Sequence, residues 1–135
     1  MEQEVFLTVL MDFDIVHDVL TAKMILDKAA NYGKIIKARI YLEQSDIDEH
    51  RESVREISKL GIEPVVTTLA KDVRFAIDLL EDAYNEKITY IVIAHNRESI
   101  LPALLYAKTL KKIIVISPIK VPKSFEAVAE EIITV

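Results

Sequence analysis

The sequence contains no cysteine, no tryptophan and only two glycines among its 135 residues. Without cysteine, neither a disulfide bond nor a thiolate metal site can form, and we therefore expect a cytoplasmic protein. No apolar run reaches the roughly 18 residues that a membrane span requires. The acidic start MEQEVF lacks the basic residues of a signal peptide. We therefore expect no association with a membrane.

The chain also lacks an excess of positive charge. It has 22 acidic and 17 basic residues, which gives a formal net charge of -5. A protein that coats nucleic acid would be basic, so this class is excluded. An enzyme that holds RNA through metal ions and a few local cations remains compatible, because clustered acids in its site lower the net charge. With 51% hydrophobic and 29% charged residues, the composition predicts one globular domain over residues 1–135.

Strand-like apolar segments alternate with segments of helical periodicity along the whole chain. Strands are expected at residues 5–11, 35–43, 62–69, 88–94, 112–118 and 132–135. Helices are expected at residues 14–32, 45–60, 71–85, 97–111 and 123–131. Pro64 indicates an edge position for the third strand, because proline cannot donate to a neighbouring strand. This order predicts an α/β fold, a three-layer α/β/α sandwich with a mostly parallel sheet of five or six strands.

Polar residues follow most of the expected strands. In a parallel sheet, sites form beyond the carboxyl ends of the strands, where the strand order reverses. The residues at these ends are Asp12 and Asp14, then Lys71, Asp72 and Arg74, then His95, Asn96, Arg97 and Glu98, and finally Ser117 and Lys120. Carboxylate and amide oxygens from several loops suit Mg²⁺ or Mn²⁺. The neighbouring Lys and Arg side chains suit phosphate.

Each acid at a strand end also has a purely structural interpretation. Asp12 can serve as a helix N-cap, and Asn96 can cap the fourth helix. Asp14, Asp72 and Glu98 can be first-turn acids that interact favourably with a helix dipole. The functional interpretation therefore depends on whether these side chains meet at one end of one sheet.

Three further polar residues lie inside expected helices. Asp78 falls on an otherwise apolar run of the third helix, so it faces either the site or solvent. We interpret His17 as structural or surface-exposed, and His50 as part of a solvated helix face.

Two of these motifs resemble those of the NYN domain, a branch of the PIN-like ribonucleases. The family's first strand ends in Asp-Gly-x-Asn or a close variant. In LMDFDIV, Asp12 matches the leading aspartate and Asp14 the frequent second acid. The family then has a lysine, an aspartate that opens a helix and a second aspartate about two turns later. In AKDVRFAID these are Lys71, Asp72 and Asp78.

A third motif follows the fourth strand, where the family has Ser-Gly-Asp-x-Asp-Phe. In AHNRESILP, Asn96 and Glu98 fall on the two aspartates. The resemblance covers nearly the whole chain and implies a PIN-like, Rossmannoid fold. It also implies a Mg²⁺- or Mn²⁺-dependent endoribonuclease that hydrolyses RNA phosphodiesters with a metal-bound water.

The resemblance assigns roles to particular residues. The implied catalytic residues are Asp12, Asp72, Asn96 and Glu98. The implied metal ligands are Asp12, Asp14, Asp72, Asp78, Asn96 and Glu98. The expected substrate-binding residues are Lys71, Arg74, Arg97 and Ser117.

Two other functions stay open. Phe13 and Ile15 stand where the family has glycine and asparagine, and this favours a non-catalytic domain that binds RNA, a nucleotide or a protein. Asp-x-Asp after a first strand also opens the haloacid-dehalogenase phosphatases, but Val16 stands where that family needs a hydroxyl. An exposed edge strand and the high apolar fraction are compatible with a homodimer.

Overall fold

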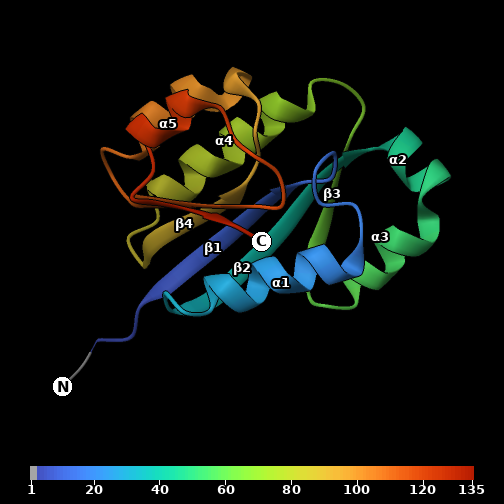
Figure 1. Cartoon of the computed structure of the whole chain (residues 1–135), viewed down its shortest axis with the longest axis horizontal. Helices are drawn as coiled ribbons and strands as arrows, with labels where there is room; N and C mark the ends of the chain where they lie inside the picture. Colours follow the sequence, from blue (N-terminus) through green and yellow to red (C-terminus); the bar gives the residue numbers. More distant parts are fainter. Residues whose placement is uncertain (1–2) are drawn as a thin grey trace.

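The protein is built around a six-stranded sheet in the strand order β3-β2-β1-β4-β5-β6 (Figure 1). A computed structural model describes residues 3–135. The strands are β1 (Phe6–Asp12), β2 (Lys34–Glu43), β3 (Glu63–Thr67), β4 (Ile88–Ala94), β5 (Lys112–Ser117) and β6 (Glu131–Thr134). The five neighbouring pairs are parallel. The predicted α/β fold with a mostly parallel sheet is confirmed.

Helices cover both faces of the sheet, which makes three layers. The α-helices are α1 (Val19–Ala29), α2 (Gln44–Glu49), α3 (Arg51–Ser58), α4 (Lys71–Ala83) and α5 (Leu101–Ala107). Two short 3₁₀-helices, η1 (Glu98–Ile100) and η2 (Lys123–Ala127), complete the set. In Figure 1, α4 and α5 lie on one side of the sheet and α1 and α3 on the other.

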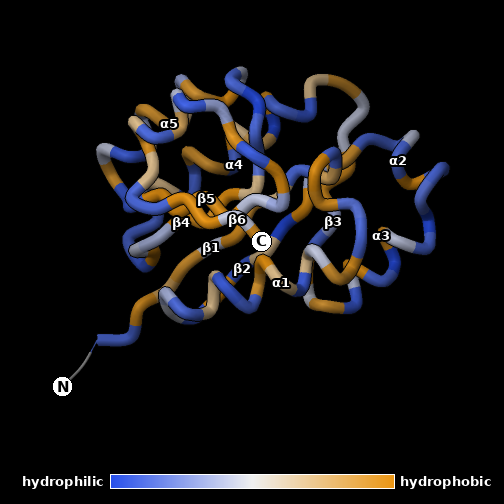
Figure 2. The backbone as a smooth tube through the Cα atoms, in the orientation of Figure 1, coloured by the Kyte–Doolittle hydropathy of each residue, from blue (hydrophilic) through white to orange (hydrophobic). Residues whose placement is uncertain are grey.

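The central strands are buried on both faces because successive side chains alternate between the two helix layers. Val9 and Met11 of β1 belong to one core cluster with Ile25 of α1. Leu10 between them belongs to a second cluster with Phe75 of α4. The central strands are accordingly the most continuously hydrophobic part of the tube in Figure 2. This double burial explains why β1 and β4 have almost unbroken apolar sequences.

The first helix begins five residues later than predicted, at Val19 instead of Asp14. The Asp12 carbonyl accepts the N–H groups of Ile15 and Val16 at 3.1 and 3.0 Å, so the chain turns before the helix begins. Asp18 is the N-cap, and its carboxylate accepts the N–H of Thr21 at 2.8 Å. The interpretations of Asp12 as an N-cap and of Asp14 as a first-turn acid are therefore wrong.

The second predicted helix is split in two. His50 has φ -130° and ψ 39°, which breaks the segment into α2 and α3. Glu43 is the N-cap of α2, and Asn96 does not cap the later η1 helix, whose N-cap is Arg97. Pro64 lies in the edge strand β3, as predicted.

Within residues 3–135, none of the helices is both long and apolar enough to cross a membrane. The prediction of one domain over residues 1–135 includes residues 1 and 2, which lie outside the described part of the chain.

Candidate metal and phosphate site

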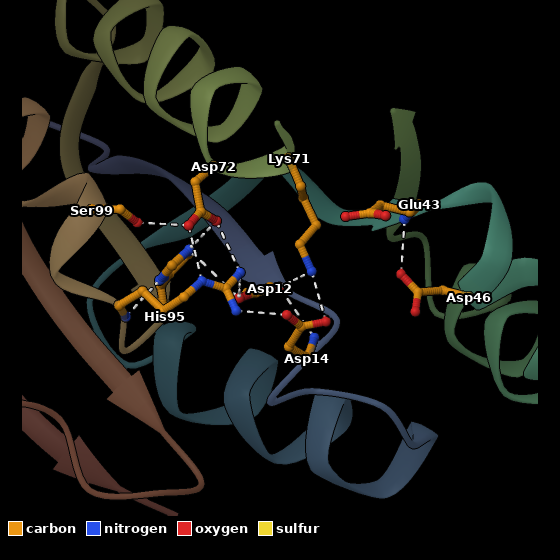
Figure 3. Close-up of polar contacts among 9 residues, drawn as sticks. Asp12, Asp14, Glu43, Asp46, Lys71, Asp72, His95 and Ser99 are labelled. Atoms are coloured by element: carbon orange, nitrogen blue, oxygen red, sulfur yellow. Dashed lines mark hydrogen bonds and ion pairs between the residues drawn. The ribbon is translucent and has the colours of Figure 1, made fainter. Parts of the chain in front are cut away.

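The candidate site lies where the strand order of the sheet reverses. From β1 the chain runs through α1 to β2 on one side, whereas α4 leads into β4 on the other side of β1. The carboxyl ends of β1 and β4 therefore diverge into different layers and leave a crevice. Asp12 ends β1, His95 follows β4, and Lys71 and Asp72 begin α4 (Figure 3).

The start of α4 is conformationally special. Ala70 precedes it with φ 53° and ψ 53°, a left-handed conformation that alanine rarely adopts. Such strain persists only where the surrounding structure fixes it, and it is common at functional sites. This turn places both Lys71 and Asp72 over the end of β1.

The structure brings two of the predicted ligands together and adds a histidine. One ligand atom each from Asp12, Asp72 and His95 lie within 4.8 Å of one another. The Nε2 atom of His95 lies 3.0 Å from Asp72 Oδ1 and 3.6 Å from Asp12 Oδ2. Asp12 and His95 are fully buried, whereas Asp72 is partly exposed. Asp14 lies beside them at the surface.

The Arg97 guanidinium lies among these carboxylates. Its Nη2 donates to Asp12 Oδ2 at 2.8 Å and to Asp72 Oδ1 at 2.9 Å. Its Nε donates to Asp72 Oδ2 at 2.9 Å, and its Nη1 donates to Asp14 Oδ2 at 2.6 Å. Because its side chain is 39% exposed, Arg97 can also reach a ligand in solvent.

Lys71 is the second cation of the site, and it is buried. Its Nζ donates to Asp12 Oδ1 at 2.8 Å and to Asp14 Oδ1 at 2.7 Å (Figure 3). Burial alone would lower the pKa of Lys71, but the hydrogen bonds and charges of Asp12 and Asp14 raise it by more, so the pKa lies above its ordinary value. Lys71 therefore stays charged and joins the first strand to α4.

Asp72 and Asp14 are both stabilised as carboxylates by the cations around them. Burial raises the pKa of Asp72, but hydrogen bonds from Arg97, Ser99 and His95 outweigh it and hold the pKa well below its ordinary value. Burial also raises the pKa of Asp14, and its bonds to Lys71 and Arg97 again produce a net decrease. Three carboxylates and two cations leave a formal charge of -3 + 2 = -1 when His95 is neutral.

His95 is best described as a positioning residue. Burial lowers its pKa and outweighs the attraction of Asp12 and Asp72, so the ring is neutral near pH 7. The Arg97 backbone N–H donates to Nδ1 at 3.1 Å, which leaves the ring proton on Nε2. The Nε2–H group then donates to Asp72. A metal-binding histidine presents an unprotonated nitrogen to the ion and donates a hydrogen bond from its other nitrogen. In His95 the nitrogen that faces the carboxylates, Nε2, carries the proton, so this tautomer orients Asp72 and does not bind metal.

The remaining donors fit a hydrated Mg²⁺ or Mn²⁺ ion. Mg²⁺ is usually held by one or two carboxylates and keeps several of its waters. Asp72, which lines a hollow at the start of α4, and the buried Asp12 behind it provide such a pair. The Arg97 Nη2 group contacts an oxygen of each, so an ion and the guanidinium compete for the same two atoms.

Several predicted site residues have other partners. Asp78 is buried and accepts from the Tyr41 hydroxyl at 2.8 Å and from Arg74 Nε at 3.2 Å. Glu98 accepts from Ser124 Oγ at 3.1 Å, and the Ser117 hydroxyl donates to the Ile119 carbonyl at 2.6 Å.

No polar contact among the described residues joins Asn96 or Glu98 to Asp12. The predicted metal, catalytic and phosphate roles of Asp78, Asn96, Glu98, Arg74 and Ser117 stay predictions.

Asp78 belongs to a second buried network between the sheet and α4. Arg39 of β2 is paired with Asp82, and its Nη1 lies 3.5 Å from Asp78 Oδ2. All three side chains are at most 7% exposed. Burial raises the pKa of Asp82 despite the opposing charge of Arg39. This network gives the acid on the otherwise apolar run of α4 buried polar partners.

Sequence reasoning did not assign a role to His95 or Ser99. Ser99 donates its hydroxyl to Asp72 Oδ2 at 2.6 Å. The signal that points to His95 is its place directly after the central strand β4, opposite Asp12.

Comparisons with known proteins agree with this architecture. The family model of the NYN domain matches residues 7–135. The chain belongs to the NYN domain family. It is thus a ribonuclease-like domain of the PIN-like group, a family that generally binds RNA and uses divalent metals.

The chain is also similar to a protein of unknown function from Vibrio parahaemolyticus RIMD 2210633 whose crystal structure is known. The TM-score is 0.81 at 14% sequence identity, and the match covers 100% of this chain and 96% of the other. At this identity the likeness shows the fold alone. No curated protein matches the chain.

Proposed function

We propose that this NYN domain is a Mg²⁺- or Mn²⁺-dependent endoribonuclease whose metal is held by Asp12 and Asp72. The observation that supports it is the meeting of Asp12 and Asp72 with Lys71 and Arg97 at the switch point of the sheet. A bound Mg²⁺ or Mn²⁺ acts as a Lewis acid toward a phosphodiester and activates water. Negative charge that develops on the phosphate then needs nearby cations.

The chain's own residues have separable tasks in this proposal. Buried Lys71 holds Asp12 and Asp14 in place. His95 and Ser99 orient Asp72 through two hydrogen bonds. Arg97 is exposed enough to leave the carboxylates and bind a phosphate oxygen, for which a guanidinium is well suited. The entry is a hollow of about 270 Å³ lined by Asp14, Glu43, Ala70, Lys71, Asp72 and Arg97.

Removal of metal provides the direct test. Purified protein is incubated with labelled single-stranded and structured RNA in EDTA, and Mn²⁺ or Mg²⁺ is then restored. We expect no cleavage in EDTA and recovery on addition of either ion. Cleavage that persists after complete chelation, or its absence with every ion tried, contradicts the proposal.

A non-catalytic RNA-binding domain is the second candidate. It is favoured by the same ion pairs, because Lys71 and Arg97 already neutralise most of the carboxylate charge. This candidate predicts RNA binding without any shift of the melting temperature on addition of Mn²⁺. A cytoplasmic location and a homodimer stay predictions from the sequence.

Replacement of Arg97 by glutamine is expected to strengthen Mn²⁺ binding about tenfold in the absence of RNA. The variant removes the cation that competes for the Asp12 and Asp72 oxygens, and charge-assisted hydrogen bonds are worth about 1.5–3 kcal/mol before solvent screening reduces them. Isothermal titration calorimetry measures the change.

Arg55→Gln is the matched control, because Arg55 pairs with the exposed Glu52 on α3, outside the site. In wild-type protein, RNA that engages Arg97 should also strengthen Mn²⁺ binding, and linkage requires the reverse effect of Mn²⁺ on RNA. Unchanged Mn²⁺ affinity in Arg97→Gln would show that the guanidinium does not compete with the ion.

A further inference from the structure

A second hollow adjoins the acid cluster on the other side of Asp14. It has a volume of about 350 Å³ and is lined by Phe13, Asp14, His17, Asp46 and His50. Asp14 also lines the hollow over Lys71 and Asp72, so the two spaces are neighbours. The volume lies within the range of small-ligand sites.

The imidazole ring of His50 lies half-exposed in the second hollow and packs against the buried ring of Phe13. The Phe13 side chain is only 3% exposed, and its backbone N–H donates to the Tyr41 carbonyl at 3.1 Å. Its ring lies 5.7 Å from the His50 ring, centroid to centroid, at 53°. The His50 side chain is 51% exposed. The buried ring therefore backs the exposed imidazole and limits its movement.

The position of His50 depends on the break between α2 and α3. A continuous helix over this segment would carry His50 as an ordinary surface residue, as the sequence predicts. With φ -130° and ψ 39°, His50 instead packs against Phe13 at the edge of the second hollow. His17 reaches the same hollow from the loop that follows β1.

The chemistry of this hollow suits a nucleobase better than a phosphate. Carboxylates of Asp14 and Asp46 line it and would repel an anion. The half-exposed imidazole of His50 provides a flat face on which an unpaired base can stack, and the buried Phe13 ring supports it from behind. The adjacent cations Lys71 and Arg97 are the part of the surface that suits the phosphate.

We propose that the second hollow is a base-binding subsite, in which an unpaired RNA base stacks on His50 next to the phosphodiester held at Arg97. The position of this base beside the cleaved bond rests on the proposed function, whereas base stacking is testable by itself. The subsite restricts the substrate class to single-stranded or unpaired RNA, because a paired base cannot enter the hollow.

The test measures binding of fluorescein-labelled single-stranded RNA by anisotropy, in EDTA and separately in Ca²⁺. His50→Ala is expected to weaken binding about 5- to 100-fold, the range found when a stacking side chain is removed. His50→Phe keeps a flat ring and should retain near wild-type affinity. Tyr84→Ala removes an exposed aromatic ring on the distant end of α4, 61% exposed, and should have no effect.

RNAs with a single abasic position show whether a base is what binds. An abasic position at the stacked base should weaken RNA binding by the wild type. It should not weaken RNA binding by the His50→Ala variant any further. Three binding outcomes overturn the proposal. The wild type and His50→Ala bind RNA with equal affinity, or His50→Phe loses as much affinity as His50→Ala, or the wild type does not bind RNA. Binding that depends on His50 without any cleavage supports the base subsite and removes the nuclease function. If His50→Ala cleaves RNA as the wild type does, the nuclease function is supported and the base subsite is ruled out.

Discussion

Changing Asp12 to asparagine is expected to abolish metal-dependent RNA cleavage and to weaken Mn²⁺ binding by about a hundredfold or more. Asp12 is fully buried at the end of β1, and its oxygens contact both Lys71 and Arg97. The substitution changes the formal charge of the site from -1 to -2 + 2 = 0. Unit charges 4 Å apart interact by about 4 kcal/mol at an effective dielectric constant near 20, so this loss is large for a divalent ion.

Asp18→Asn is the matched control for this variant. Asp18 lies in the loop that follows β1 and caps α1, and asparagine is as good an N-cap as aspartate. The control should cleave RNA and bind Mn²⁺ as the wild type does. Thermal melts of both variants separate loss of function from loss of folding. If Asp12→Asn cleaves at the wild-type rate while it stays folded, the metal site lies elsewhere.

Changing Arg39 to methionine is expected to destabilise the protein by about 3–5 kcal/mol, the usual cost of breaking a buried ion pair from one side. Arg39 is paired with Asp82 and lies near Asp78, and the variant leaves these buried carboxylates without that cation. Chemical denaturation followed by circular dichroism measures the free energy of unfolding.

The double variant Arg39→Met with Asp82→Leu should recover a large part of the lost stability, because it removes an uncompensated charge. Neither variant should alter Mn²⁺ affinity in folded protein, because this network shares no polar contact with Asp12 or Asp72 among the described residues. A rise in Mn²⁺ affinity in Arg39→Met, at temperatures where the protein is folded, would instead support Asp78 as a metal ligand, because the variant removes a cation that competes for its carboxylate.

Much of the fold could be predicted because its causes are local. Alternating apolar strands and helical periodicity indicated a parallel α/β sheet, and the six strands and both helix layers are present. The rule that parallel strands place their carboxyl ends together predicted the meeting of Asp12 with Asp72. Helix boundaries were less accurate, since the turn after β1 depends on hydrogen bonds of the Asp12 carbonyl.

The site was predicted less completely for a physical reason. Spacing along the chain shows which residues start α4, but not which way a side chain two turns later points. Asp78 therefore matched a motif, whereas in the structure it pairs with Tyr41 and Arg74. The sequence places His95 at a strand end but cannot show its role, because that role depends on Asp72, which lies 23 positions away and meets it across the crevice.

The pair Asp12 and Asp14 shows most clearly what each level determines. The sequence alone determined that two carboxylates follow a doubly buried strand at the edge where sites form, because hydrophobic periodicity is a local property. Only the tertiary structure decided their partners. Arg97 and Asp12 lie 85 positions apart and meet only because β4 pairs directly with β1. That pairing places the Arg97 guanidinium among the carboxylates, so in the proposed function a metal ion competes with Arg97 for Asp12 and Asp72.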